Sequence, residues 1–222
     1  MNNRFTLQTA TRQRLQNLRL IARGLLLSAV IGVLGYEQIE QMRHDEATQH
    51  YFFSAIEDNF YENPANWHPE YPGTVVEANT RIVIQDMAYL TGFDLEVKGL
   101  LEIDMGASLY SDQNDLHFSE NGKLDNQGEI IVNNIHNNGL IFNQTGAKIH
   151  VKSFVSKQGG SVQNLRSAEF IVIDSLTNQG YFLNYSYCAA GELFNHSQFQ
   201  QIKGSELHID GKSIELVALY RP

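Results

Sequence analysis

The sequence predicts an all-β protein whose body is a single-stranded parallel β-helix, preceded by an apolar or helical N-terminal segment. Short stretches in which apolar and polar residues alternate are typical of half-buried strands. Asn and Gly, which tolerate tight corners, separate these stretches. Similar phrases recur at a spacing of about 20 residues, which is the length of one coil of a solenoid. We expect the coil to be right-handed.

The expected strands follow residue 63 and are three to five residues long. They cover residues 81–85, 95–97, 100–103, 130–132, 148–151 and 169–173. Beyond residue 60, no stretch of useful length has the period of a helix. A β-sandwich would need longer strands that recur every 8 to 12 residues or so, as turn signals do in such folds. The short strands therefore favour a solenoid, which we place at residues 63–222.

Two phrases carry the repeat. The first has Asn two residues after an apolar residue, Gly four after it and another apolar residue six after it; it begins at Leu124, Ile135, Leu176 and, with Ser in place of Gly, Leu193. The second is two small residues, any residue and an apolar one, and it begins at Gly106, Gly146, Ser167 and Gly204. Inward Asn side chains can bond to the backbone of the next coil, so we expect them to stack at the corners.

Residues 1–35 are predicted to be a signal peptide or a membrane anchor. They contain five arginines and no acidic residue, and an uncharged run of 13 residues begins at Gly24. A membrane-spanning helix needs about 20 apolar residues, so the run suits a secretory signal cleaved before Tyr36. The alternatives are an uncleaved inner-membrane anchor over residues 18–39, with Arg19 and Arg23 reaching the interface, and an amphipathic cytosolic helix.

Residues 36–62 are predicted to be a helical connector followed by an aromatic cap. Good helix formers without Gly or Pro suggest a helix to about His50. The aromatic and apolar residues at 51–61 then cover the open N-terminal end of the solenoid, since their exposure would invite aggregation. At the other end, residues 214–220 are expected to form a last strand or cap.

The charge and cysteine content exclude several classes of protein. With 16 basic and 25 acidic residues the net charge is −9, whereas a nucleic-acid-binding protein needs a basic face, so no nucleic-acid partner is expected. One cysteine, Cys188, excludes an intramolecular disulfide and a cysteine-based zinc site. No basic residue lies near it in the sequence, so we interpret it as a small buried apolar residue.

One stretch of the sequence resembles a known class of protein. Residues 63–73 contain Trp67 and end in Pro72-Gly73, and an alternating strand follows at residues 80–84. Residues 95–109 then read Leu-x-Val-x-Gly-x-Leu-x-Ile-x-x-Gly-Ala-x-Leu. Over residues 60–210 the chain resembles the Asn/Gly-rich β-solenoid repeat regions of secreted Bacteroidetes-type cell-surface proteins. The resemblance implies a secreted or surface-attached solenoid and no particular activity.

The candidate ligand residues have simpler interpretations. The acidic residues Asp104, Asp112, Asp115 and Glu120 lack the spacing of a calcium loop, so we expect a solvated turn. The histidines have no zinc-site spacing and are expected at surfaces or corners: His117, His136, His150, His196 and His208. Sequons begin at Asn143, Asn184 and Asn195, which already have a corner role, and Asp174-Ser175-Leu176 fits a short bacterial O-glycosylation pattern.

An enzyme is one alternative, because some parallel β-helices cleave polysaccharides. Hydrolysis of a polysaccharide needs two carboxylates that face each other. The best candidates are Asp174 and Glu192, near the aromatic residues Tyr181, Tyr185 and Tyr187. The acidic residues of the chain alternate with apolar ones, as solvent-facing positions do. We therefore predict no catalytic, cofactor-binding or metal-binding residue.

The expected function is that of an exported, non-enzymatic β-solenoid with a structural or adhesive role, secreted or at the cell surface. Its expected partners are surface proteins, glycans or copies of itself, and membrane contact is expected only through residues 18–39 if these are not cleaved. One alternative is an inner-membrane-anchored, self-assembling scaffold that resembles small β-helical cytoskeletal proteins of bacteria. The other is a polysaccharide-active β-helix enzyme.

Overall fold

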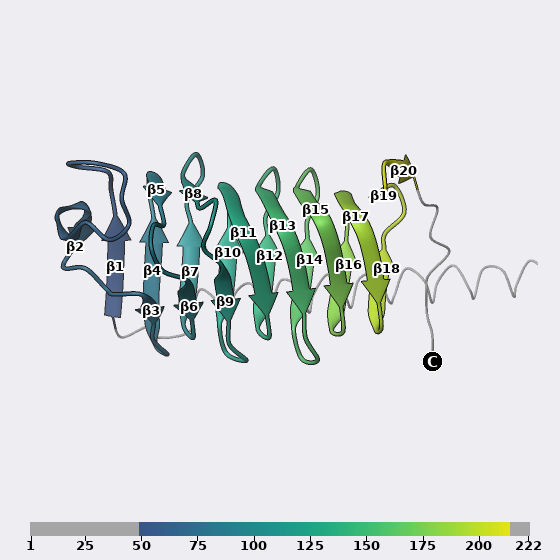
Figure 1. The fold of residues 1–222 in the computed structure, drawn as a ribbon, viewed down its shortest axis with the longest axis horizontal. Coiled ribbons are helices and arrows are strands. Elements are labelled where there is room, and N and C mark those ends of the chain that lie inside the picture. The colour runs from purple at the N-terminus through teal and green to yellow at the C-terminus, as the bar shows by residue number, and fades with distance from the viewer. Residues whose placement is uncertain (1–48, 214–222) are drawn as a thin grey trace, which may run out of the picture. The chain divides into compact units, whose positions relative to one another are not determined.

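Two parallel sheets wind together into a β-solenoid of about seven turns, which confirms the predicted fold class (Figure 1). The computed structural model describes residues 49–213, all within the compact unit Glu46–Pro222. The predicted segment at residues 1–35, the connector up to residue 48 and the predicted C-terminal cap at residues 214–220 lie outside the described residues. Within residues 49–213, no helix has both the length and the apolar character needed to cross a membrane.

Each coil contributes strands to both sheets. In spatial order, the nine-stranded sheet contains β2 (Trp67–His68), β1 (Gln49–Phe53), β4 (Thr80–Ile84), β7 (Leu100–Ile103), β10 (Lys123–Asn126), β12 (Leu140–Asn143), β14 (Ser161–Asn164), β16 (Tyr181–Asn184) and β18 (Gln198–Gln201). The eleven-stranded sheet contains β3 (Val75–Val76), β6 (Leu95–Val97), β9 (Leu116–Phe118), β11 (Glu129–Asn137), β13 (Lys148–Ser156), β15 (Glu169–Asn178), β17 (Tyr187–Asn195), β19 (Glu206–Ile209), β20 (Lys212–Ser213), β5 (Met87–Tyr89) and β8 (Ser108–Tyr110).

The long strands of the eleven-stranded sheet bend partway along, so that this sheet has two outer faces. Residues 129–131 of β11 pair with β8, whereas residues 135–137 of the same strand pair with β9. We call the side of β5, β8 and the first halves of the long strands the first face, and the side of β3, β6, β9 and the second halves the second face. Strands β11, β13 and β15 are nine or ten residues long, which is longer than the three to five predicted, because pairing between coils continues through the bend.

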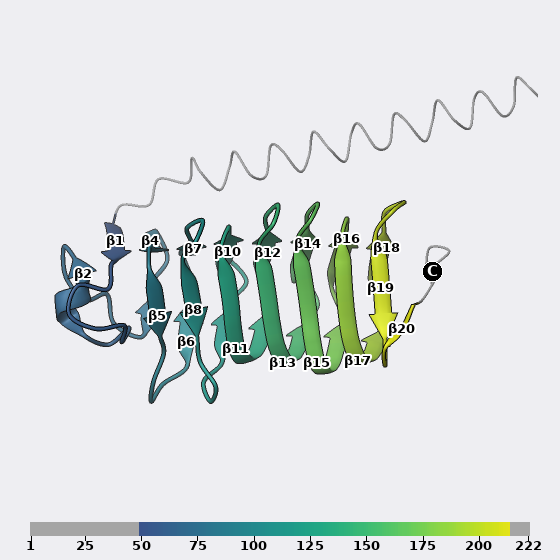
Figure 2. The same ribbon diagram turned by 90° about the horizontal axis from the view of Figure 1, so that it is seen from above.

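Figure 2 shows the strands of successive coils stacked side by side. The core consists of the inward side chains between the two sheets. Leu, Ile, Val and Phe side chains dominate it, and most of them are fully buried. In the later coils Phe154 and Phe170 meet edge to face with ring centroids 5.0 Å apart, and Phe182 and Phe199 stack at 4.8 Å. Removal of this apolar surface from water is the main force that holds the coils together.

Buried asparagines form ladders at the corners, as predicted. One ladder lies where the strands of the nine-stranded sheet end. The side-chain amides of Asn126, Asn143 and Asn164 each donate to the side-chain oxygen of the next Asn at 2.8 Å, and the ladder ends at Asn184. Each amide also donates to a backbone carbonyl of the next coil. These four residues have no exposed surface, so the ladder satisfies polar groups that would otherwise be buried without partners.

The first repeated phrase occupies two different corners. The copy that begins at Leu124 ends a strand of the nine-stranded sheet, whereas the copies at Ile135, Leu176 and Leu193 end strands of the eleven-stranded sheet. A second ladder lies where the strands of the eleven-stranded sheet end, and it contains Asn137, Asn178 and Asn195, with Ser156 in place of an Asn. The side-chain amide of Asn137 donates to the Ser156 hydroxyl at 3.4 Å. Both corners need the same inward amide, which explains why the phrase does not identify the corner.

Glycines serve two purposes in the coil. In the second phrase, Gly106, Gly146, Ser167 and Gly204 have φ values of +84°, +81°, +59° and +92°, so this turn requires a left-handed residue. A separate column precedes the strands of the nine-stranded sheet and lets successive coils approach closely: Gly99, Gly122, Gly139, Gly160 and Gly180. A Cβ atom on Gly139 would lie 2.0 Å from the carbonyl oxygen of Gly122.

An aromatic cap covers the N-terminal end of the solenoid, which is close to the prediction. Phe53 and Tyr61 have no exposed surface, and each packs edge to face on Trp67 with ring centroids 5.3 and 4.7 Å apart. The indole nitrogen of Trp67 donates to the carbonyl oxygen of Tyr61, and the short 3-10 helix η1 (Pro64–Asn66) leads into β2. Ile56 and Phe60, which were expected in the cap, are instead 73% and 47% exposed.

The predicted helix does not extend to His50. Gln49 and His50 are the first residues of β1, and they pair with Thr80 and Arg81 of β4. Local residue types in this stretch favour a helix, but hydrogen bonding to the edge of the first coil outweighs that weak preference.

Candidate functional site

The outward side chains of the eleven-stranded sheet form columns, because residues in register on successive coils lie side by side. One column on the first face contains Tyr89, Tyr110, Ile131 and His150. One column on the second face contains Glu96, His117, His136 and Val155. Since outward side chains do not build the core, their chemistry can vary from coil to coil, and two groups of them differ from an ordinary solvated surface.

The first group is an exposed apolar patch at the N-terminal end of the first face. We define the apolar patch as Phe60, Met87, Tyr89 and Tyr110. Phe60, Met87 and Tyr89 are 47%, 36% and 40% exposed, and Phe60 forms a β-bridge with Tyr89. The rings of Tyr89 and Tyr110 stack with centroids 5.5 Å apart. Side chains of these types are typical of the centres of protein interfaces.

Acidic groups border the apolar patch. The hydroxyl of Tyr110 donates to Glu129 at 2.9 Å, and this hydrogen bond, followed by burial, raises the pKa of the Tyr110 hydroxyl. Asp86 precedes Met87 and is exposed, while Asp58 lies two residues before Phe60. The carboxyl of Asp58 accepts a hydrogen bond from the Phe60 backbone, which is the largest of the effects that lower its pKa. The patch therefore has an apolar centre with a mainly acidic rim, in which Lys148 lies in register beside Glu129.

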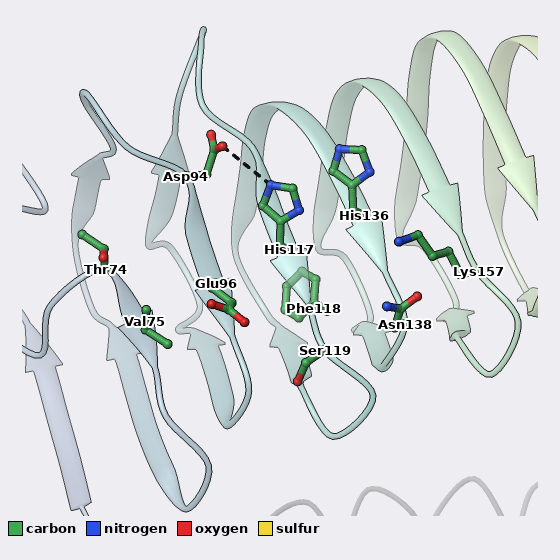
Figure 3. Close-up of a pocket in the computed structure, with 10 residues that line it drawn as sticks. All are labelled: Thr74, Val75, Asp94, Glu96, His117, Phe118, Ser119, His136, Asn138 and Lys157. Atoms are coloured by element: carbon green, nitrogen blue, oxygen red, sulfur yellow. Dashed lines mark ion pairs between the residues drawn. The ribbon is translucent and has the colours of Figure 1, made fainter.

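The second group lines a groove on the second face, with a volume of about 550 Å³ (Figure 3). The rings of His117 and His136 stack almost in parallel, with centroids 4.7 Å apart and an interplanar angle of 4°. Figure 3 shows the two rings side by side on neighbouring coils, with Asp94 pointing toward His117. The Nε2 atom of His117 is 3.7 Å from a carboxylate oxygen of Asp94. The groove also contains Glu96 and Lys157.

Asp115 completes this group from the bend beside β9. Its Oδ2 atom lies 3.4 Å from Nε2 of His136. Its other oxygen accepts hydrogen bonds of 2.9 Å from the side-chain amides of Asn133 and Asn134. Asp115, His117 and His136 each offer one ligand atom, and these atoms all lie within 4.8 Å of one another. We call Asp94, Asp115, His117 and His136 the histidine–carboxylate cluster.

The sequence spacing did not reveal this cluster. A zinc-site spacing such as His-Glu-x-x-His places two ligands on one element, but His117 and His136 are 19 residues apart and come together only through coil-to-coil pairing. Asp112 is exposed, as a solvated turn predicts, whereas Asp115 of the same acidic stretch joins the cluster. The available signal was repeat position: Leu116-His117-Phe118 and Ile135-His136-Asn137 occupy the same place in successive coils.

The other candidate residues are dispersed. Asp174 and Glu192 are exposed and lie at the bend of β15 and β17, where Ser175 pairs with Glu192. The tyrosines named with them lie on different parts of the coil: Tyr181 begins a strand of the nine-stranded sheet, Tyr185 is in the turn after it and Tyr187 begins β17. His150 and His208 each lie near a glutamate, Glu169 and Glu206, at 3.5 and 3.2 Å.

The sequon asparagines and the cysteine have inward positions. Asn143 and Asn184 are fully buried in the first ladder, and Asn195 accepts a hydrogen bond from Asn178 in the second. Cys188 has no exposed surface, and burial raises the pKa of its thiol, so the thiolate is disfavoured in the folded chain. The side chain packs in the core as a small apolar group.

Comparisons with known proteins identify no relative of this chain. No family model, no curated protein and no solved structure matches it. The solenoid architecture therefore rests on the strand register described above, and functional inference rests on the outer faces.

Proposed function

We propose that this chain is an exported, non-enzymatic adhesive β-solenoid that binds a protein partner at the cell surface through the apolar patch. The observation that carries the proposal is the contiguous exposure of Phe60, Met87 and Tyr89 on one outer face. Exposed apolar patches on soluble proteins mark interaction sites, and Tyr, Phe and Met are enriched at interface centres. The location at the surface is supported by the basic, then apolar, N-terminal sequence and by the resemblance to secreted repeat proteins.

The rim of the patch indicates what kind of partner it fits. Asp58, Asp86 and Glu129 border the apolar centre, and the whole chain carries a net charge of −9. A second copy would bring two acidic rims together, which costs free energy through like-charge repulsion. A partner with an apolar centre and basic side chains around it would be complementary in both respects. We therefore favour a basic-rimmed protein over self-association through this face.

The N-terminal cap weighs against the alternative of an end-to-end scaffold. An open solenoid end offers unpaired strand edges that promote assembly. Here β2 pairs antiparallel with β1, through Phe52↔His68 and Phe53↔Trp67, and the aromatic cap covers the core beneath it. If the purified full-length chain nevertheless formed filaments as its concentration rose, the scaffold would replace adhesion as the proposed function.

The patch proposal is tested by charge substitutions within it. Surface proteins of the host cell are passed over the immobilised full-length chain, and retained proteins are compared among Met87→Asp, Tyr89→Asp and the unchanged protein. We expect a discrete retained protein whose affinity falls at least about tenfold in both variants, as loss of a central interface residue does. Phe194→Asp is the matched control, since Phe194 is 46% exposed on the second face. Equal retention by all variants would contradict the proposal.

Export is tested by the intact mass and cell fraction of the protein recovered from its own host. We expect a chain that begins near Tyr36 and lies outside the inner membrane. A chain that begins at Met1 and fractionates with the inner membrane would instead support the anchored form. The measurement is independent of the patch substitutions, so the location and the binding face are judged separately.

A further inference from the structure

We propose that the histidine–carboxylate cluster binds one divalent transition-metal ion, of which Zn²⁺ is the best match. Imidazole nitrogen and carboxylate oxygen together are ligands that suit Zn²⁺ and its neighbours rather than calcium or magnesium, which prefer oxygen alone. The site is separate from the apolar patch, which lies on the other face of the bent sheet. It therefore does not depend on the proposed adhesive function.

The ligand set comes from two neighbouring coils. His117 and His136 are in register on β9 and β11, and Asp115 lies at the bend just before His117. One potential ligand atom from each of the three lies within 4.8 Å of the other two. Ligand atoms around a zinc ion lie about 2.0–2.2 Å from it. An imidazole nitrogen binds a metal in the plane of its ring, so ion binding requires both rings to turn out of their parallel stack until their nitrogens converge.

The orientation of Asp115 is fixed by neighbours that leave one oxygen for the ion. The amides of Asn133 and Asn134 both donate to Oδ1 at 2.9 Å, and Oδ2 faces His136 at 3.4 Å. Hydrogen bonds that hold a carboxylate ligand in this way are a regular feature of metal sites. The Asp115 side chain is only 18% exposed, so it is held in the wall of the bend rather than extended into solvent.

Asp94 adds a second carboxylate from the preceding coil. Its Oδ1 atom accepts a hydrogen bond from the backbone of Asp115 at 2.8 Å, and its Oδ2 atom lies 3.7 Å from His117. Asp94 thus orients His117 and lowers the cost of placing a positive ion beside it. We assign it a positioning role, because it lies outside the group of three whose ligand atoms converge.

The shape of the groove leaves room for a further ligand. Three protein ligands are one fewer than a closed structural zinc site has, and the groove of about 550 Å³ lies open beside the cluster. A water molecule or a side chain of a bound partner would complete the coordination. The inference is thus a surface metal site of open coordination, built by stacking of coils.

The experiment measures binding of ZnCl₂ to the purified full-length chain by calorimetry and of Co²⁺ by absorption spectroscopy. We expect one equivalent of Zn²⁺ to bind, and the Co²⁺ form to show the visible bands of nitrogen- and oxygen-bound cobalt. His136→Ala and Asp115→Asn should abolish this equivalent, and Asp94→Asn should weaken it about tenfold, as loss of an orienting group does. His150→Ala and His208→Ala are matched controls, since each also removes a histidine that lies near a glutamate.

Two results would overturn the proposal. One is the absence of saturable binding at one equivalent in the unchanged protein. The other is Zn²⁺ binding that survives His136→Ala and Asp115→Asn alike, which would place the ion elsewhere. His136 faces outward, so its variant should fold, and circular dichroism together with the unfolding temperature checks that it does. If His136→Ala were unfolded, His117→Gln would test the same ligand set from the neighbouring coil.

Discussion

Gly139→Ala is expected to destabilise the solenoid by about 3 kcal/mol or more, the upper part of the range for overpacking a tightly packed site. A Cβ atom at this position would lie 2.0 Å from the carbonyl oxygen of Gly122 and 2.5 Å from that of Ser119. Both contacts are with backbone atoms, which cannot rotate away. The same Gly122 carbonyl accepts the hydrogen bond from Leu140, at 3.0 Å, that joins two coils. Relief of the clash would therefore break coil-to-coil pairing.

The unfolding midpoint of the full-length variant checks this prediction, with Gly146→Ala as the control. Gly146 has a φ of +81°, but a Cβ atom there would meet nothing within 4 Å. Its substitution should cost only the penalty of a left-handed non-glycine residue, about 1–2 kcal/mol. The two variants thus separate close approach of coils from backbone conformation. If Gly146→Ala were the more damaging, the steric explanation of the glycine column would be wrong.

Asn143→Asp is expected to have a similarly large effect, although it changes a single amide to a carboxylate. The amide of Asn143 donates to Asn164 at 2.8 Å and to the backbone of Glu169 at 2.9 Å. A carboxylate would turn an acceptor toward both of these acceptors in a position with no exposed surface. Each lost buried hydrogen bond costs about 1–3 kcal/mol, and an unpaired buried charge adds to that.

The pH dependence of this variant follows from the same contacts. The Asn126 amide still donates to one oxygen of the new carboxyl, but the other oxygen faces two acceptors, so burial raises the pKa of this carboxyl above its value in the unfolded chain. A protonated carboxyl restores one donor. Above the unfolded pKa the unfolded chain then binds fewer protons than the folded one, so stability falls as the pH rises. The deficit relative to the unchanged protein should therefore shrink as the pH is lowered.

Asn138→Asp is the matched control for the ladder, because Asn138 undergoes the same chemical change at a partly exposed position. Its unfolding midpoint should stay close to that of the unchanged protein. Denaturant or thermal unfolding of both variants over a range of pH makes the comparison. Equal loss in the two, or no loss in Asn143→Asp, would show that the amide ladder does not hold the coils together.

Local patterns were sufficient to predict the fold class and several strands. The predicted strands at residues 81–85, 95–97 and 100–103 match β4, β6 and β7 to within one residue, because alternation and flanking turns are properties of the local sequence. The long strands were missed since Asn133 and Asn134 are both partly exposed, which interrupts the alternation although pairing continues. The predicted helix end at about His50 was wrong for Gln49 and His50, which belong to β1, because pairing with β4 is not visible in the local sequence.

The candidate site was the least predictable feature. Repeat phrases located the corners, but the phrase at Leu124 and the phrase at Ile135 look alike and occupy different corners. Without the length of each coil, His117 and His136 could not be placed side by side. The strands that begin successive coils of the nine-stranded sheet start at Leu100, Lys123 and Leu140, so the intervals are unequal. Contacts between coils therefore need the register, which three-dimensional pairing defines.

The glycine column and the asparagine ladders recur over several successive coils, whereas the histidine pair depends on which coil follows which. Loss of the chain between Leu100 and Gly122 would rejoin two similar turns, each with a glycine before the strand, and leave a shorter solenoid with the same inward contacts. Glu96, which now lies beside His117, would then lie beside His136. Gain or loss of whole coils can thus preserve the architecture while it exchanges the chemistry of the outer faces. In this fold, evolution can therefore change what the outer faces bind by changing the order of the coils.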